Sequence, residues 1–322
     1  MLRDLLQGFQ ASSPQTVGNM TLVPLVAQNT EWLAVGDLRD VYLEQDQSYD
    51  TLVMATRSPH ITIIPQGLVF ITKERAQDRT LPSAHLVQTQ KTCHAFCVQS
   101  SQGGLMQRDT TKQREFHLLP AGVRLAALNK RNQEGYSAIW EDLQAFNQKL
   151  KVPGNFLVTF FQNYQKQLAE FVSEFEPVSF QRGAVILING EVVGVEVMPN
   201  SLAFLAMWEP LIRDCYGAEA LLHSSSAPVA VPVIMEDVES LDDLVGAVED
   251  LARRERAWAE SVVEVALTQK EQLLKEESEG SFELYAVETA EFEGQLVQRN
   301  GETLYLSLLR KSPLRRPFCW QR

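Results

Sequence analysis

Several side chains with binding chemistry gather in the charged segment Lys73–Arg79, which follows an apolar, strand-like run. The segment reads Lys-Glu-Arg-Ala-Gln-Asp-Arg. Loops carried by a rigid scaffold commonly hold binding groups, and the forked guanidinium of arginine matches phosphate and carboxylate. Arg75 and Arg79 therefore make this segment a candidate binding loop. The simpler alternative is a solvated turn with local ion pairs.

A second group with reactive side chains is Cys93-His94-Ala-Phe-Cys97. Thiols and imidazole are soft metal ligands, and a thiol is also a nucleophile. On a strand, however, residues four apart lie on one face about 13 Å from each other, too far to share an ion or a disulfide. The cysteines are therefore predicted to be buried structural residues. No metal site and no cofactor are predicted, because the remaining cysteines and histidines are single residues.

Acidic pairs recur late in the chain, and their spacing fits the wet face of a helix better than a cation site. The chain has no glycine-rich phosphate loop, no H-E-x-x-H and no G-x-S-x-G sequence. Whether the protein is an enzyme is therefore left open. The acidic groups are Glu236-Asp237, Asp242-Asp243, Glu249-Asp250 and Glu276–Glu279.

The last residues, 311–322, form a tail that combines arginines with Phe318 and Trp320. A flexible tail, or one whose aromatic rings dock on the body, competes with a nucleic-acid-binding tail. The formal net charge of −12 and pI near 5.0 disfavour a nucleic-acid partner.

Composition describes an ordinary soluble globular protein. The 322 residues are 45% hydrophobic and 22% charged, enough for one large or two smaller cores. No apolar run approaches the roughly 20 residues that span a bilayer. Four cysteines do not make a disulfide framework. A cytoplasmic protein without a membrane partner is expected.

The first half is predicted to be rich in β-strands. Residues 1–17 form a short helix and connector, and residues 18–150 form a β-rich domain that ends in a helix carrying Trp140. Pro24 within the first strand suggests an edge strand or a bulge. The apolar run Val123–Leu128 is placed before the helices begin. The predicted strands are Met20–Val26, Trp32–Val35, Val41–Leu43, Leu52–Thr56, His60–Ile64, Leu68–Thr72, His85–Thr89, Cys93–Gln99 and Phe116–Leu119.

The second predicted domain, residues 151–310, contains the best-specified unit of the chain, Gly183–Tyr216. Asn189-Gly190 accepts the positive φ angles of a tight hairpin turn. Ser201 is expected to cap the following helix. Two amphipathic helices, Tyr136–Lys149 and Phe156–Phe175, precede this ββα unit. Its helix is expected to bury Leu202, Leu205, Trp208, Leu211, Ile212 and Cys215 on one face.

A long helix is predicted from Ser240 to Glu279, with Ser240 and Asp243 as a capping box and Gly280 as its stop. Packing on its own domain competes with self-association into a homo-oligomer through 240–279, and Glu255 interrupts a coiled-coil seam. An apolar strand at Val229–Met235 precedes this helix. Strands Phe282–Thr289, Gln295–Gln298 and Thr303–Leu308 close the chain, with a second Asn-Gly hairpin. The fold class is α+β.

Several blocks together resemble the ARG-and-Rhodanese-Phosphatase-superfamily-associated protein family, a bacterial domain of unknown function. The likeness runs through most of the chain. The Asn-Gly hairpin with the Trp208 helix is among its clearest points, and Ala76-Gln77-Asp78-Arg79 resembles the family's Gln-Asn-Arg or Gln-Asp-Arg element. The other similar blocks are Gly18–Leu25, Val53–Thr72, Cys93–Leu105, Tyr136–Trp140 and Glu283–Leu308.

This chain departs from the family pattern at two places. Gln99-Ser-Ser-Gln-Gly-Gly-Leu105 stands where the family tends to have glutamate followed by Gly-Arg-Trp, and Thr72–Arg75 replaces a glycine-rich approach. The resemblance implies a genomic association with ADP-ribose-linked and NAD-linked enzymes. It makes Gln77 and Arg79 plausible ligand contacts.

We therefore expect a binding or accessory protein linked to NAD and ADP-ribose metabolism. It would take a phosphate-bearing small molecule such as ADP-ribose on a loop containing Arg75, Gln77, Asp78 and Arg79. The alternatives are a self-associating scaffold and a hydrolase that acts on a nucleotide or ADP-ribosyl bond with carboxylates such as Asp78.

Overall fold

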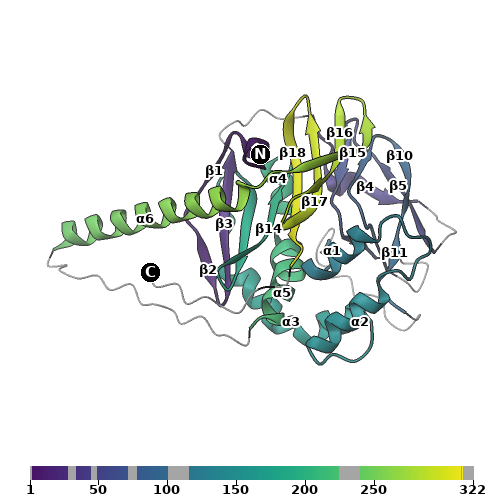
Figure 1. The fold of residues 1–322 in the computed structure, drawn as a ribbon, viewed down its shortest axis with the longest axis horizontal. Helices are drawn as coiled ribbons and strands as arrows, with labels where there is room; N and C mark the ends of the chain where they lie inside the picture. Colours follow the sequence, from purple (N-terminus) through teal and green to yellow (C-terminus); the bar gives the residue numbers. More distant parts are fainter. Residues whose placement is uncertain are drawn as a thin grey trace.

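A large antiparallel sheet forms the centre of the protein (Figure 1). The computed structural model describes residues 2–27, 34–44, 49–71, 78–100, 116–224, 240–312 and 314. Within these residues the sheet has nine strands in the order β1-β3-β13-β14-β18-β17-β16-β15, and β2 also pairs with β3. The strands are β1 Phe9–Ala11, β2 Gln15–Val17, β3 Met20–Ala27, β13 Gln181–Ile188, β14 Glu191–Val197, β15 Gln272–Glu279, β16 Phe282–Glu288, β17 Phe292–Arg299 and β18 Glu302–Arg310.

Short strands of the first half build three smaller sheets, in the orders β10-β5-β4, β11-β8-β7-β12 and β6-β9. The predicted β-rich first half is therefore confirmed. Residues 32 and 33 of the predicted strand Trp32–Val35 lie outside the described residues, and 34 and 35 are not in a strand. The strands are β4 Val41–Leu43, β5 Thr51–Thr56, β6 Thr62–Ile64, β7 Leu68–Phe70, β8 Arg79–Thr80, β9 His85–Val87, β10 Gln90–His94, β11 Phe96–Cys97 and β12 His117–Leu118.

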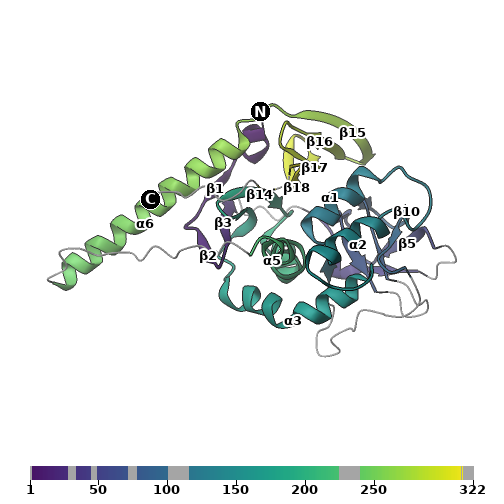
Figure 2. The same ribbon diagram turned by 60° about the horizontal axis from the view of Figure 1, so that its bottom comes forward.

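Helices α1, α2, α3 and α5 gather beside the large sheet, whereas α6 extends away from the opposite side of the body (Figure 2). The helices are α1 Ala121–Asn129, α2 Trp140–Lys149, α3 Leu157–Glu174, α4 Ser201–Glu209, α5 Ala218–Leu222 and α6 Leu241–Leu267. Leu2–Leu6 (η1) and Leu38–Asp40 (η2) are 3-10 helices, and Pro210–Gly217 (η3) is a π-helix. The described residues include no helix with the length and apolar character needed to cross a membrane.

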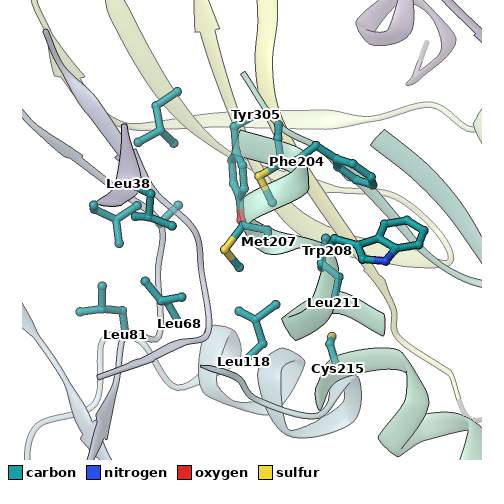
Figure 3. Packing of buried hydrophobic residues seen from close by; sticks show 14 of the residues in the cluster. Leu38, Leu68, Leu81, Leu118, Phe204, Met207, Trp208, Leu211, Cys215 and Tyr305 are labelled. Atoms are coloured by element: carbon teal, nitrogen blue, oxygen red, sulfur yellow. The ribbon is translucent and has the colours of Figure 1, made fainter. Parts of the chain in front are cut away.

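One hydrophobic cluster joins the two halves of the chain (Figure 3). Leu38, Leu68 and Leu81 enter it from the β-rich half, and Tyr305 enters it from β18. Trp208 is 6% exposed and belongs to this cluster, so its predicted role as a core residue is confirmed. The predicted division near residue 150 stays a prediction, and the core draws on residues from both sides of it.

The Asn-Gly hairpin is confirmed. β13 pairs with β14, and Asn189 and Gly190 have φ angles of 52° and 81°. The helix cap differs from the prediction, because the side chain of Asn200, rather than Ser201, accepts a hydrogen bond from the Ala203 amide at 2.8 Å.

The buried face of α4 also differs from the prediction. Leu202 and Leu205 are 51% and 55% exposed, whereas Phe204 and Met207 are buried. The sequence of α4 is apolar on nearly every side, so its pattern does not select a face. Packing against the core makes the choice, and the π-helix Pro210–Gly217 then continues the buried side through Leu211 and Cys215.

The predicted helix Ser240–Glu279 is confirmed up to Leu267 and is wrong beyond it. The capping box of Ser240 and Asp243 is present, but α6 ends at Leu267. Gln272–Glu279 is the edge strand β15 instead, and it pairs with β16. Gly280, with a φ of +58°, lies in the two-residue turn between the paired residues Glu279 and Phe282. The residues of this segment have good helix propensity, but pairing with β16 in the folded chain outweighs that propensity.

Two smaller predictions also need correction. Val123–Leu128 lies in helix α1. Pro24 lies on β3, which is an interior strand because β13 pairs along one edge and the short strands β1 and β2 pair along the other. Ser12, in the gap between β1 and β2, donates its amide hydrogen to the carbonyl of Pro24. Proline has no amide hydrogen to donate, and on this edge Pro24 faces the gap between the two short strands. The predicted strand Val229–Met235 lies outside the described residues.

Candidate functional site

A cleft of about 420 Å³ opens where edge strand β15 meets β9, the end of β10 and the loop after α1. Its volume lies within the range of small-molecule sites, roughly 300–1,000 Å³. The cleft is lined by Pro82, Ser83, Ala84, His85, His94, Arg131, Asn132, Leu274, Glu276, Glu277 and Leu284.

Two consecutive glutamates line this cleft because β15 is irregular. Consecutive residues of a regular strand point to opposite faces. The register of β15 against β16 shifts between Lys275 and Glu277, so Glu276 is an extra residue at that point. A β-bulge of this kind re-aims side chains. Glu276 and Glu277 can therefore both face the cleft, with side chains that are each 20% exposed.

A cation accompanies each glutamate. Arg131 donates from Nε to Glu276 at 2.9 Å and from Nη1 to the carbonyl of Leu128 at 2.9 Å, which fixes its guanidinium at the end of α1. Lys91 pairs with Glu277. The buried amide of Gln295 donates to Glu276 at 2.6 Å and accepts from the Ala84 amide at 2.7 Å. The polar wall of the cleft is thus held by bonds to three separate parts of the chain.

Two histidines complete the polar lining. The Nε2 atoms of His85 and His94 are buried and have no hydrogen-bond partner within the described residues. Burial lowers the pKa of His85 to about 3, helped by the nearby charges of Lys91 and His94, so this imidazole is neutral at physiological pH. Buried polar nitrogens are normally hydrogen-bonded in folded proteins. These two nitrogens are exceptions to that rule, and both belong to residues that line the cleft.

The residues predicted as ligand contacts are only partly described. Arg75 and Gln77 lie outside the described residues. Asp78 is 0% exposed and accepts a hydrogen bond from the side chain of Gln99 at 2.9 Å. Arg79 is 3% exposed and donates to the carbonyl of Thr51. Asp78 and Gln99 are 21 positions apart in the sequence, and their side chains contact each other in the interior.

Arg79, at the described end of the predicted loop, is connected to a cleft residue through the strand ladder and is not itself among the lining residues. Thr51, whose carbonyl accepts from Arg79, is paired with the cleft residue His94 in the β5–β10 ladder. Trp140 donates its indole N–H to the carbonyl of Cys97 at 3.1 Å, and Cys97 is paired with Arg79. Arg79 and Trp140 are therefore both neighbours of Cys97.

A fully buried ionic cluster lies deeper in the molecule. Arg124 and Glu196 are both 0% exposed, and Arg124 Nη1 lies 2.5 Å from Glu196 Oε1. The same carboxylate accepts from Tyr216 at 2.7 Å and from Ser307 at 3.2 Å. Burial, followed by the charge of Glu196, raises the pKa of Tyr216 well above its ordinary value. With no solvent access and mutually satisfied groups, this cluster is structural.

A second buried ion pair involves His117 and Asp214, whose Nδ1 and Oδ2 atoms are 3.0 Å apart. Arg213 also contacts Asp214, at 2.6 Å from Nε to Oδ1. Burial alone would raise the pKa of Asp214, but the charges of Arg213 and His117 outweigh it and the pKa is lowered. Asp214 also accepts from the backbone amide of Leu118, so the arrangement ties β12 to the π-helix.

The cysteines among the described residues are buried, as predicted for Cys93 and Cys97. Cys93, Cys97 and Cys215 are free thiols in the interior. Burial raises the pKa of Cys93 and Cys215 to about 12 and that of Cys97 to about 11, so these thiols stay protonated. Among the described residues, no group of three or more histidines, cysteines or acids is arranged to hold a metal ion.

Sequence reasoning missed the residues that build the cleft. Glu276 and Glu277 were assigned to the wet face of a helix, and Arg131 and His85 were not singled out. Glu276 lies 145 positions after Arg131 in the chain. No local sequence pattern indicates that these residues lie close together, because their proximity depends on the pairing of β15 at the edge of the sheet.

The fold and the cleft define an α+β protein with a polar surface site. The sequence matches the family described as ARG and Rhodanese-Phosphatase-superfamily-associated Protein domain over residues 8–307. The chain therefore belongs to this family, and the resemblance inferred from its motifs is confirmed. No curated protein and no solved structure matches the chain.

Proposed function

We propose that this protein is a binding or accessory protein of NAD and ADP-ribose metabolism, and that the cleft beside β15 takes a ligand of the ADP-ribose type. The association with ADP-ribose-linked and NAD-linked enzymes is what the resemblance to the family implies, and the family description itself names ARG and rhodanese-phosphatase proteins. The observation that carries the site is the cleft itself, which brings Arg131 and the histidines His85 and His94 together with Glu276 and Glu277.

The chemistry of the cleft suits a ligand with hydroxyl groups and phosphate. A sugar hydroxyl both donates and accepts hydrogen bonds, so it can satisfy a neutral imidazole and a carboxylate together. Carboxylates commonly bind ribose hydroxyls in nucleotide sites. Arg131 offers a guanidinium at the cleft, and arginine binds phosphate through two parallel hydrogen bonds.

Binding is favoured over hydrolysis by the state of the two acids. Glu276 is engaged by Arg131 and Gln295, and Glu277 by Lys91. Asp78, the acid considered for catalysis from sequence, is buried and bonded to Gln99. Carboxylates held in this way are suited to orient a ligand.

Calorimetric titration of the whole protein with ADP-ribose and with NAD tests the proposal. We expect saturable binding by the wild type and binding at least about tenfold weaker in Arg131→Ala, equivalent to a loss of about 1.4 kcal/mol. Lys166→Ala is the matched control, because Lys166 is an exposed cation on α3 that does not line the cleft. It should bind as the wild type does.

A further variant separates the cleft from the predicted loop. Arg75→Ala should leave binding unchanged if the ligand lies in the cleft, and loss of binding in this variant alone would assign the ligand to the 75–79 loop. No saturable binding of either compound by the wild type would remove the proposal. Chromatography of the recovered ligand, with and without Mg²⁺ or Mn²⁺, distinguishes binding from turnover.

A further inference from the structure

The first half of α6 projects from the body (Figure 1). It carries an apolar stripe that the described residues leave exposed. Leu241 is 75% exposed, Val245 50% and Val248 47%. Leu244, on the same side, is 39% exposed. These residues recur at spacings of three and four, the pattern of a helix face that packs against another element. None of them belongs to a hydrophobic cluster of the described residues.

The exposed stripe continues a seam that is already packed. Ala259 is buried in the second half of α6, and Trp258, Val262 and Val263 pack against the cluster that contains Leu2 of η1. Arg3 pairs with Glu264 at 2.8 Å beside this contact. At 1.5 Å per residue the 27-residue helix is roughly 40 Å long, and the described part of the body covers only its second half. The apolar face therefore runs beyond the surface that covers it.

Charges along α6 are segregated in a way that favours one mode of pairing. Asp242 and Asp243 lie in the first turn, and Arg253, Arg254 and Arg256 follow about three turns later. All five residues are exposed. A parallel pair of such helices would place aspartate near aspartate. An antiparallel pair centred on Val248 places Asp242 opposite Arg254, so opposite charges flank the apolar stripe.

We propose that the first half of α6 binds the same half of α6 in a second copy of this chain, antiparallel, about a two-fold axis near Val248. Such an interface is isologous, because each copy contributes the same surface. In this register Val248 meets its symmetry mate, Val245 lies opposite Leu251 of the second copy and Leu244 lies opposite Ala252, and the acidic and basic ends pair on both sides. The inference is independent of the proposed ligand, since the cleft lies outside α6.

Sedimentation of the full chain across a wide concentration range tests this inference. The wild type should pass from monomer to dimer as concentration rises. Replacing two exposed valines together, Val245→Glu and Val248→Glu, should weaken the dimer at least about tenfold, because charge would enter the apolar stripe. Val265→Glu is the matched control, since Val265 is 75% exposed on the same helix but lies outside the projecting half. It should dimerise as the wild type does.

A charge exchange tests the antiparallel arrangement. Asp242→Arg alone and Arg254→Glu alone should each weaken the dimer, and the two together should restore it. A wild type that is monomeric at every concentration would overturn the proposal, including the case in which residues 225–239 cover the stripe within one chain. An equal loss in the Val265→Glu control would also overturn it, because any added negative charge would then suffice. Circular dichroism of each variant checks that α6 stays helical.

Discussion

At the scale of single residues, the buried pair Arg124–Glu196 is the most demanding feature of the interior. Both side chains are 0% exposed, and Glu196 collects hydrogen bonds from Arg124, Tyr216 and Ser307. The surrounding backbone leaves room for them. A Cβ on Gly194 would lie 2.0 Å from Tyr216 Oη, and one on Gly67 would lie 2.6 Å from Arg124 Cγ. The cluster therefore depends on two glycines as well as on its charges.

Removing one member of this pair should be far more costly than removing an exposed ion pair. Glu196→Gln leaves a buried guanidinium without its counter-charge, and we expect a loss of about 3–5 kcal/mol in the free energy of unfolding. Arg124→Met combined with Glu196→Gln should recover part of this loss. Urea denaturation measures it.

The matched control is Arg3→Ala, which breaks the exposed pair between Arg3 and Glu264. Exposed pairs contribute about 1 kcal/mol or less. If Glu196→Gln lowered the free energy of unfolding by only about 1 kcal/mol, the buried pair would contribute no more than an exposed one.

At the scale of elements, the edge strand β15 decides the shape of the candidate site. Its bulge brings Glu276 and Glu277 to one cleft, and its pairing with β16 depends on the turn at Gly280. Gly280 has a φ of +58°, a conformation that residues with a Cβ rarely adopt. A substitution at Gly280 therefore tests the β15–β16 hairpin separately from the rest of the sheet.

Gly280→Ala should destabilise the protein by about 1–2 kcal/mol, because alanine pays for the left-handed conformation. Gly246→Ala is the matched control. Gly246 lies within α6 with open space where a Cβ would be, so this change should be neutral or should stabilise the helix by about 0.5–1 kcal/mol. Thermal denaturation compares them. Equal effects of the two changes would indicate a helix, rather than a hairpin, before Gly280.

At the scale of the whole molecule, the first and second halves of the chain share one sheet and one core. β3 pairs with β13 over most of its length, and the core cluster in Figure 3 combines Leu68 and Leu81 with Phe204 and Tyr305. The ionic cluster has the same character, since Arg124 belongs to the first half and Glu196 to the second. Stability should therefore belong to the chain as a unit.

A fragment of residues 18–150 should not fold by itself. It would expose β3 along the edge that β13 covers, and it would leave Arg124 without Glu196. We expect a fragment with weak near-ultraviolet circular dichroism and no cooperative thermal transition. The intact chain, measured in parallel, should unfold in one transition. A fragment that melts cooperatively would instead support an independent domain ending near residue 150.

The sequence by itself determined the features whose causes are local. Asn189-Gly190 and Asn300-Gly301 formed hairpins because their positive φ angles are set within the turn, with values of 52° and 81° at the first and 53° and 83° at the second. The capping box at Ser240 likewise needed only neighbours three residues apart. Motif likeness was sufficient to identify the family.

Tertiary structure decided what depended on distant partners. Gln272–Glu279 became a strand because β16 was available to pair with it, and the nearly all-apolar helix α4 buried Phe204 instead of Leu205 because the core lay on that side. The candidate cleft joins His85, Arg131 and Glu276, and no sequence spacing connects them. Local propensities act over a few residues, whereas the site was fixed by which strand edges met across the folded chain.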